Sequence, residues 1–214
     1  MIFLERRQLV LADLKVTEFL QETASNSPVP GGGSVAALSA ALAAGLAEMV
    51  AGLTVGRKGF ETVEPEMKSI LEKAGVLRTK LIHDIQRDSD AYNQVMAAYK
   101  LPKTTEEEKA QRSRSIQEGL KQAALVPLEV AQNALEILGF AQTAVTRGNP
   151  NAVTDGAVGA MLARTAGLGA LYNVKINLSS IKDEEFVEKT ASEVNRLEAQ
   201  IIDKEKQILA GVRL

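Results

Sequence analysis

Apolar residues recur at helical spacing along almost the whole chain, and this pattern limits the possible folds more than any other feature. They return every three or four residues, whereas runs of alternating apolar and polar residues, which indicate strands, are missing. We therefore expect an all-α fold. The chain of 214 residues is long enough for one helical domain, residues 1–214, whose core needs no disulfide or metal.

Turn and cap signals divide the chain into about six helices, and we expect the long ones to pack antiparallel as a bundle. The third helix should end before Pro102, because the residue before a proline is pushed out of helical geometry. Thr104 and Glu107 fit a capping box, Asp183 fits an N-cap, and Pro127 should kink the fourth helix. The expected helices cover residues 13–25, 32–56, 62–99, 104–141, 152–173 and 183–213.

The charge balance and the residue types that are missing exclude several classes of function. Lys plus Arg number 25 and Asp plus Glu number 27, which argues against a nucleic-acid-binding protein. The chain has no cysteine and one histidine, which excludes disulfides, zinc–thiolate sites, thiol nucleophiles and histidine-rich metal sites. If the chain is an enzyme, carboxylates, Lys, Arg, Asn and Ser must carry its chemistry.

Residues 35–55 have the length of a membrane span, but their composition does not favour one. Ala and Gly make up nearly half of the segment, 10 of its 21 residues, and Glu48 would lie well inside the bilayer. We expect a helix buried in protein and no membrane partner. The N-terminal sequence MIFLERRQLVLADL carries charge within five residues, so we expect no signal peptide and a cytoplasmic location.

One face of the third expected helix is apolar except for a single carboxylate. That face consists of Leu77, Leu81, Ile85, Asp88, Tyr92, Val95 and Tyr99. An ionised Asp88 in such a stripe must be paired, hydrogen-bonded or held with a raised pKa. It is therefore either a structural carboxylate bonded to a neighbouring helix or a general acid/base. Asp84 and Asp90 lie off the stripe, and we expect them in solvent or paired with Arg87.

The stretch PVPGGGS, residues 28–34, directly precedes the alanine-rich second helix. It matches neither a P-loop nor a dinucleotide-binding glycine motif. Gly31, Gly32 and Gly33 allow close approach to the backbone, and the first-turn amides beside Ser34 suit a carboxylate or carbonyl ligand. The alternative is a tight turn packed under another helix. Glu48 shares the helix face of Ser34, so we expect it to face the same groove.

Small residues also mark one face of the fifth expected helix, with a polar group at each end. That face consists of Asp155, Gly159, Leu162, Ala166, Gly169 and Asn173. Small side chains either let another helix approach closely or leave room for a ligand, and Asp155 could instead only compensate the helix dipole. The basic residues Arg57, Lys58, Lys100 and Lys103 follow helix ends. They favour an acidic ligand, although lysines are ordinary at such positions.

Five sequence blocks together resemble the cyclodeaminase/cyclohydrolase family. They are PVPGGGSVAALSAALAAGLAEMV, DSDAYNQVMAAYKLPKTTEEEKAQR, IQEGLKQAALVPLEVA, RGNPNAVTDGAVGAMLA and YNVKINLSSIKDEEF. The likeness runs from about residue 13 to residue 190, nearly the whole chain. The family includes the cyclodeaminase half of formiminotransferase-cyclodeaminase and stand-alone methenyltetrahydrofolate cyclohydrolases. The formiminotransferase half is missing here, so that transfer activity is not expected.

The resemblance implies an all-helical homodimer with folate sites near the subunit interface. It also implies one-carbon chemistry on a reduced folate without a metal or redox cofactor. The acid of the family falls on Asp88, which the apolar stripe indicates independently. The other family blocks place substrate-binding positions on Gly31, Gly32, Gly33, Ser34, Lys103, Asn149, Asp155 and Asn173, and Asn151 lies in the same block as Asn149.

The expected reaction is cyclisation of 5-formiminotetrahydrofolate to 5,10-methenyltetrahydrofolate with release of ammonia. The alternative on the same scaffold is hydrolysis of the methenyl bridge, a cyclohydrolase reaction. Two non-enzymatic alternatives stay open. One is a helical dimer that binds folate or another acidic metabolite without catalysis, and the other is a structural partner protein that binds no folate.

Overall fold

A computed structural model gives the structure of this chain and describes residues 10–213. Within that range the chain is all-helical, with six α-helices and no strand, which confirms the expected class. The helices are η1 (Leu11–Asp13), α1 (Val16–Thr23), α2 (Gly32–Gly52), α3 (Glu64–Tyr99), α4 (Glu106–Arg147), η2 (Pro150–Ala152), α5 (Val153–Leu178) and α6 (Glu184–Ala210). Most of the sequence on which the expectation of no signal peptide rests lies outside the described residues.

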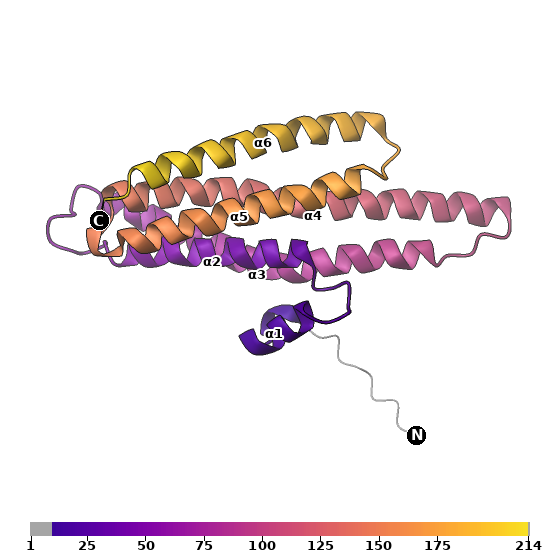
Figure 1. The fold of residues 1–214 in the computed structure, drawn as a ribbon, viewed down its shortest axis with the longest axis horizontal. Helices are drawn as coiled ribbons and strands as arrows, with labels where there is room; N and C mark the ends of the chain where they lie inside the picture. The colour runs from indigo at the N-terminus through magenta and orange to yellow at the C-terminus, as the bar shows by residue number, and fades with distance from the viewer. Residues whose placement is uncertain (1–9, 214) are drawn as a thin grey trace, which may run out of the picture.

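Helices α2 to α6 form an elongated bundle in which each helix runs antiparallel to the next along the chain (Figure 1). Helix α2 packs against α3 and α5, and α4 packs against α3, α5 and α6. Helix α1 lies to one side, with Phe19 buried. Because the helices alternate in direction, successive connections lie at opposite ends of the bundle.

Several helix boundaries differ from the predicted ones. The capping box of α4 pairs Thr105 with Glu108, one residue later than predicted. Helix α4 continues through Pro127 to Arg147. Helix α5 runs to Leu178 and α2 stops at Gly52. The predicted N-cap of α6 is confirmed, since the Asp183 side chain accepts a hydrogen bond from the backbone amide of Phe186.

The small residues of α2 and α5 bring these two helices close together. A Cβ atom on Gly159 would lie 3.4 Å from the Leu46 Cβ, and one on Gly169 would lie 3.8 Å from the Ala36 Cβ. By length and composition, α2 and α4 are each apolar enough to cross a membrane, but about half of each apolar stretch is buried in the bundle. Burial against neighbouring helices accounts for the alanine-rich sequence of α2.

Candidate functional site

The glycine-rich start of α2 and Asp88 of α3 lie together in one groove. Gly31, Gly32, Gly33, Asp88 and Asn173 all line it, and its volume is about 380 Å³. Three elements therefore contribute predicted residues: the turn into α2, the second half of α3 and the last turns of α5. The wall also contains side chains that the prediction did not assign to the site, namely Tyr92, Met96, Tyr99, Ile176 and Asn177.

The backbone at Gly33 is in direct contact with the Asp88 side chain. A Cβ atom on Gly33 would collide with the carboxyl group, whereas one on Gly32 would lie 3.5 Å from Asn173 Nδ2, an ordinary contact. The turn before α2 includes a cis peptide bond between Val29 and Pro30. Close approach to the glycine backbone was predicted, and the group that approaches is Asp88.

The Asp88 carboxyl is a half-buried acid held by Ser34. The Ser34 hydroxyl lies 3.0 Å from Asp88 Oδ2 and can donate a hydrogen bond to it. Burial raises the pKa of Asp88, and hydrogen bonds from the Ser34 hydroxyl and backbone offset part of that increase. None of the ion pairs between described residues involves Asp88. The group is therefore suited to hold a proton closer to neutrality than an ordinary aspartate.

Asp84, one turn earlier on α3, has different partners. Its carboxyl is only 1% exposed and accepts from Arg87 Nη1 at 2.6 Å and from Lys80 Nζ at 2.8 Å. Both cations also reach Glu129 of α4. The predicted pairing with Arg87 is confirmed, and the predicted solvent position is wrong because the α3–α4 contact covers the side chain. Asp90 accepts a hydrogen bond from Gln86.

Glu48 does not face the groove, which corrects the prediction from helix periodicity. Arg78 Nε donates to Glu48 Oε2 at 2.7 Å, linking α2 to α3. Glu48 lies 14 residues after Ser34, about 20 Å along the helix axis. A shared helix face does not bring two residues to one site when four turns separate them.

The amides of α5 connect the groove to the rest of the bundle. Asn173 Nδ2 donates to the Gly169 carbonyl at 2.9 Å, and Asn177 Nδ2 donates to the carbonyls of Asn173 and Ala123. The link to Ala123 fixes α5 against α4 at the groove. Asn177 follows Asn173 by one helical turn, so the same periodicity that indicated Asn173 also indicates Asn177.

Lys103 lies at the groove end of the bundle but is not part of the groove wall. It is exposed in the connection between α3 and α4. The last residue of α3, Tyr99, does line the groove. Arg112 donates to the Tyr99 carbonyl and its guanidinium lies 5.6 Å from the centre of the ring. Helix α4 thus holds the aromatic end of the groove in place.

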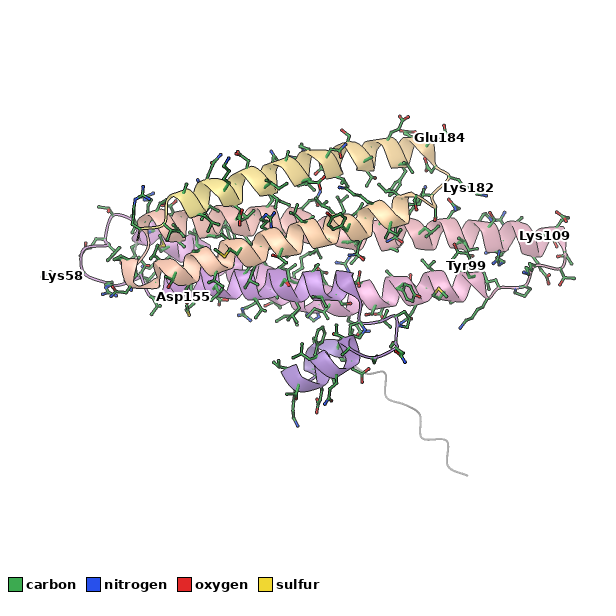
Figure 2. The ribbon with its side chains drawn as sticks, viewed as in Figure 1. Lys58, Tyr99, Lys109, Asp155, Lys182 and Glu184 are labelled. Carbon is green, nitrogen blue, oxygen red and sulfur yellow. The ribbon has the colours of Figure 1, made fainter. Side chains whose placement is uncertain are left out.

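The predicted residues of the RGNPN turn lie at the opposite end of the bundle. Figure 2 shows Asp155 near Lys58 at one end and Tyr99 toward the other. Asn149 is buried there, accepting from the Asn151 amide and donating to the Leu53 carbonyl. Within one chain, therefore, neither Asn149 nor Asp155 meets Asp88. Across residues 10–213, no three His, Asp or Glu side chains cluster as metal ligands.

Comparisons with known proteins agree on one family. The sequence model described as formiminotransferase-cyclodeaminase matches residues 15–196. Methenyltetrahydrofolate cyclohydrolase of Methylorubrum extorquens is 41% identical over 86% of this chain and 89% of its own length. Formimidoyltransferase-cyclodeaminase of Rattus norvegicus is 36% identical over 87% of this chain, which spans only 35% of that longer protein.

A solved structure gives the same result in three dimensions. The crystal structure of formiminotetrahydrofolate cyclodeaminase from Thermotoga maritima superposes with a TM-score of 0.84 at 34% sequence identity. The match covers 94% of this chain and 96% of the other. The likeness therefore includes the whole bundle and is not confined to the groove.

Proposed function

Because this chain belongs to the formiminotransferase-cyclodeaminase family of folate enzymes, we propose that it cyclises 5-formiminotetrahydrofolate to 5,10-methenyltetrahydrofolate and releases ammonia. One observation carries the proposal. A half-buried Asp88 with a raised pKa faces a groove built from glycine backbone, two asparagines and tyrosines. Loss of ammonia needs a proton donor beside the ligand, and the neutral form of Asp88 is that donor.

The reaction can be written with Asp88 as a general acid. The N10 atom of the substrate attacks the carbon of the protonated formimino group (N5–CH=NH2+) and forms a five-membered ring that carries a neutral amino group. Asp88 then protonates the former imino nitrogen, the bond between that nitrogen and carbon breaks, and ammonia leaves. The N10 proton is lost, and the Asp88 carboxylate recovers a proton from N10 or from solvent. Positioning supplies part of the rate because the attack is intramolecular, and a placed acid typically adds ~10²–10⁴-fold.

The groove residues also have proposed binding roles. The amides of Gly31, Gly32 and Gly33 and the side chain of Asn173 offer hydrogen bonds to the polar edge of a pterin ring. Ser34 holds Asp88 in place. We assign Lys103, exposed at the same end of the bundle, to the negatively charged glutamate part of the folate. The tyrosines of α3 provide the apolar wall of the groove.

A second reaction, hydrolysis of the methenyl bridge to 10-formyltetrahydrofolate, is favoured by one specific observation. The relative from Methylorubrum extorquens, which is 41% identical to this chain, is a stand-alone methenyltetrahydrofolate cyclohydrolase. In that reaction water attacks the same carbon, and the ionised form of Asp88 would act as a base or stabilise the cation. The same groove geometry thus suits either direction of proton transfer.

Absorbance of the methenyl chromophore separates the two reactions. Purified protein is given either 5-formiminotetrahydrofolate or 5,10-methenyltetrahydrofolate, with an enzyme-free sample as control. Growth of the methenyl band with ammonia release supports cyclodeaminase activity. Faster decay of the methenyl form than in the control supports cyclohydrolase activity. If neither rate exceeds the control, both catalytic proposals fail, and folate binding then decides between a binding protein and a structural one.

We further propose that the chain acts as a homodimer joined through the outer faces of α2 and α5. These adjacent helices expose a set of large apolar side chains, namely Leu42, Met49, Leu53, Val158, Met161, Tyr172 and Ile176. Ile176 also lines the groove, so a partner that covers this face would border the site. Sedimentation should give the dimer mass, and Leu42→Glu combined with Met161→Lys should give the monomer mass.

Such a dimer offers a role for the residues at the far end of the bundle. In one chain Asp155 lies at the opposite end of the bundle from Tyr99 (Figure 2), which lines the groove together with Asp88, but antiparallel pairing across α2 and α5 would place Asp155 of one copy near Asp88 of the other. Mixing Asp88→Asn and Asp155→Asn proteins tests this arrangement. Each hybrid dimer would then contain one intact site of two. Because about half of randomly mixed dimers are hybrids, mixing should restore about a quarter of wild-type activity. No recovery would show that each site uses one chain only.

A further inference from the structure

One buried hydroxyl in the site has more hydrogen-bond partners than it can serve at once. Ser34 Oγ lies 3.0 Å from the Ile85 carbonyl, 3.0 Å from Asp88 Oδ2 and 3.1 Å from Ser89 Oγ. Ser34 and Ser89 are 0% and 2% exposed. A hydroxyl has one hydrogen and two lone pairs, so Ser34 can donate to only one of these three groups.

Which group receives that hydrogen depends on the proton state of Asp88. When Asp88 is ionised, Ser34 donates to the carboxylate and Ser89 can donate to Ser34. When Asp88 is neutral, its own hydroxyl can donate to Ser34, which then donates to Ser89 or to the Ile85 carbonyl. Both directions leave each buried polar atom with a partner, which avoids the cost of an unsatisfied group.

We propose that Ser89 is a positioning residue for Asp88, and that the Ser34–Ser89 hydroxyl pair reverses its donor direction each time Asp88 loses or regains its proton. No proton leaves the pair, since only the hydroxyls rotate; the transferred proton moves between Asp88 and the bound folate. The catalytic consequence rests on the function proposed above. The reversal itself depends only on the contacts among Ser34, Ser89 and Asp88.

Few other ionisable groups lie near Asp88 in the described part of the chain. The lining from α2, α4 and α5 consists of glycines, Ala123, Ile176 and the two asparagines, and α3 adds Tyr92 and Tyr99 beside Asp88. Elsewhere on α3, Asp84 is paired with Lys80 and Arg87, and Asp90 accepts from Gln86. η1, which packs on α3, carries Asp13. Among the described residues that line the groove, Asp88 is therefore the one carboxyl group.

Ser89→Ala tests the proposal without any substrate. The side-chain carboxyl carbons of ¹³C-aspartate-labelled protein are titrated by NMR, and the Asp88 signal is identified by its loss in Asp88→Asn. Without Ser89, no hydroxyl donates a hydrogen bond to Ser34 when Asp88 is ionised, so the ionised form of Asp88 is less well stabilised. The midpoint of the Asp88 titration should therefore rise by about half a pH unit. Ser89→Cys, which keeps the volume but donates weakly, should raise it in the same direction, and Ser89→Thr should restore it.

The matched control is Ser39→Ala on α2. Its hydroxyl donates to the Val35 carbonyl at 2.9 Å and does not contact Asp88, so the midpoint should not move. A midpoint in both Ser89→Ala and Ser89→Cys that equals the wild-type value would overturn the proposal. The titration needs no turnover, so it is independent of the proposed reaction. If the protein is inactive but shows the predicted shift, the proposed reaction is wrong and the proposal for the Ser34–Ser89 hydroxyl pair still holds.

Discussion

Asp84 and Asp88 lie one turn apart on α3; Asp84 is fully buried, and Asp88 is half-buried in the groove wall. Asp84 contacts two cations, Lys80 and Arg87, which also bind Glu129 and so link α3 to α4. Asp88 contacts a serine hydroxyl and glycine backbone, and its pKa is raised. The difference teaches that neighbours, and not burial alone, decide whether a buried aspartate holds the fold together or stays available for proton transfer.

The largest expected effect comes from Asp88→Asn. Removing the acid should lower turnover by about 10²–10⁴-fold while folate still binds. The free energy of unfolding should change by less than about 1 kcal/mol, because two effects oppose each other. Asparagine removes the cost of burying a charge, but it also removes the favourable interaction of that charge with the first turn of α2. Steady-state kinetics, equilibrium dialysis with folate and urea unfolding measure the three quantities. Unchanged turnover would make Asp88 a structural carboxylate like Asp84.

Gly33→Ala should have the next largest effect, because the new methyl group would occupy the space of the Asp88 carboxyl. Displacing that group by about 1 Å is expected to cost about 10²-fold in turnover. Gly32→Ala is the matched control, since its methyl group would make only an ordinary contact with Asn173. Equal activity in the two variants would show that the close approach at Gly33 does not position the acid.

Asp84→Asn should reverse the pattern expected for Asp88. It removes two charge-assisted hydrogen bonds and leaves Lys80 and Arg87 with Glu129 alone, so unfolding free energy should fall by about 2 kcal/mol. Turnover should stay within a few-fold of wild type. Asp90→Asn, which loses only the contact with Gln86, serves as the stability control. A large loss of turnover with unchanged stability would show that Asp84, and not Asp88, is the catalytic aspartate.

The smallest expected effect is a difference in how stability depends on pH. The pKa of Asp88 is raised above its ordinary value of 3.8, so the folded state binds more protons than the unfolded state in the interval above 3.8. Stability contributed by Asp88 is therefore present below that interval and is lost as pH rises through the folded pKa. In urea unfolding, the free energy of unfolding of Asp88→Asn should increase relative to that of wild type as pH rises across this interval. A constant difference would mean that the pKa is not raised.

Much of the fold followed from the sequence, because helices are local structures. Apolar spacing and cap residues predicted the six helices, and the single carboxylate in the stripe of α3 indicated Asp88. The boundaries moved where distant contacts decide them. Helix α5, for example, continues past Asn173 because Asn177 bonds to Ala123 of α4.

The arrangement of the site was harder to predict because it depends on which helices meet and in which direction. Periodicity placed Glu48 on the face of Ser34, but Arg78 of α3 binds it about four turns away. Asn149 and Asp155 follow a connection at the far end of the bundle. Successive connections in an antiparallel bundle lie at opposite ends. The order of the helices after Ser34 is therefore enough to place these residues at the end away from Asp88. The catalytic role of Asp88 stays a prediction, and so do the substrate-binding roles of Gly31, Gly32, Gly33, Ser34, Lys103, Asn149, Asp155 and Asn173.

The pH dependence of kcat/KM on 5-formiminotetrahydrofolate, compared between wild type and Asp88→Asn after subtraction of the enzyme-free rate, tests the central claim most directly. If neutral Asp88 is the acid, wild-type activity should be highest below its pKa and fall as pH rises through it, with a midpoint above 3.8. That dependence should be missing in Asp88→Asn. The same falling limb in the variant, or wild-type activity that rises with pH through this range, would contradict the account.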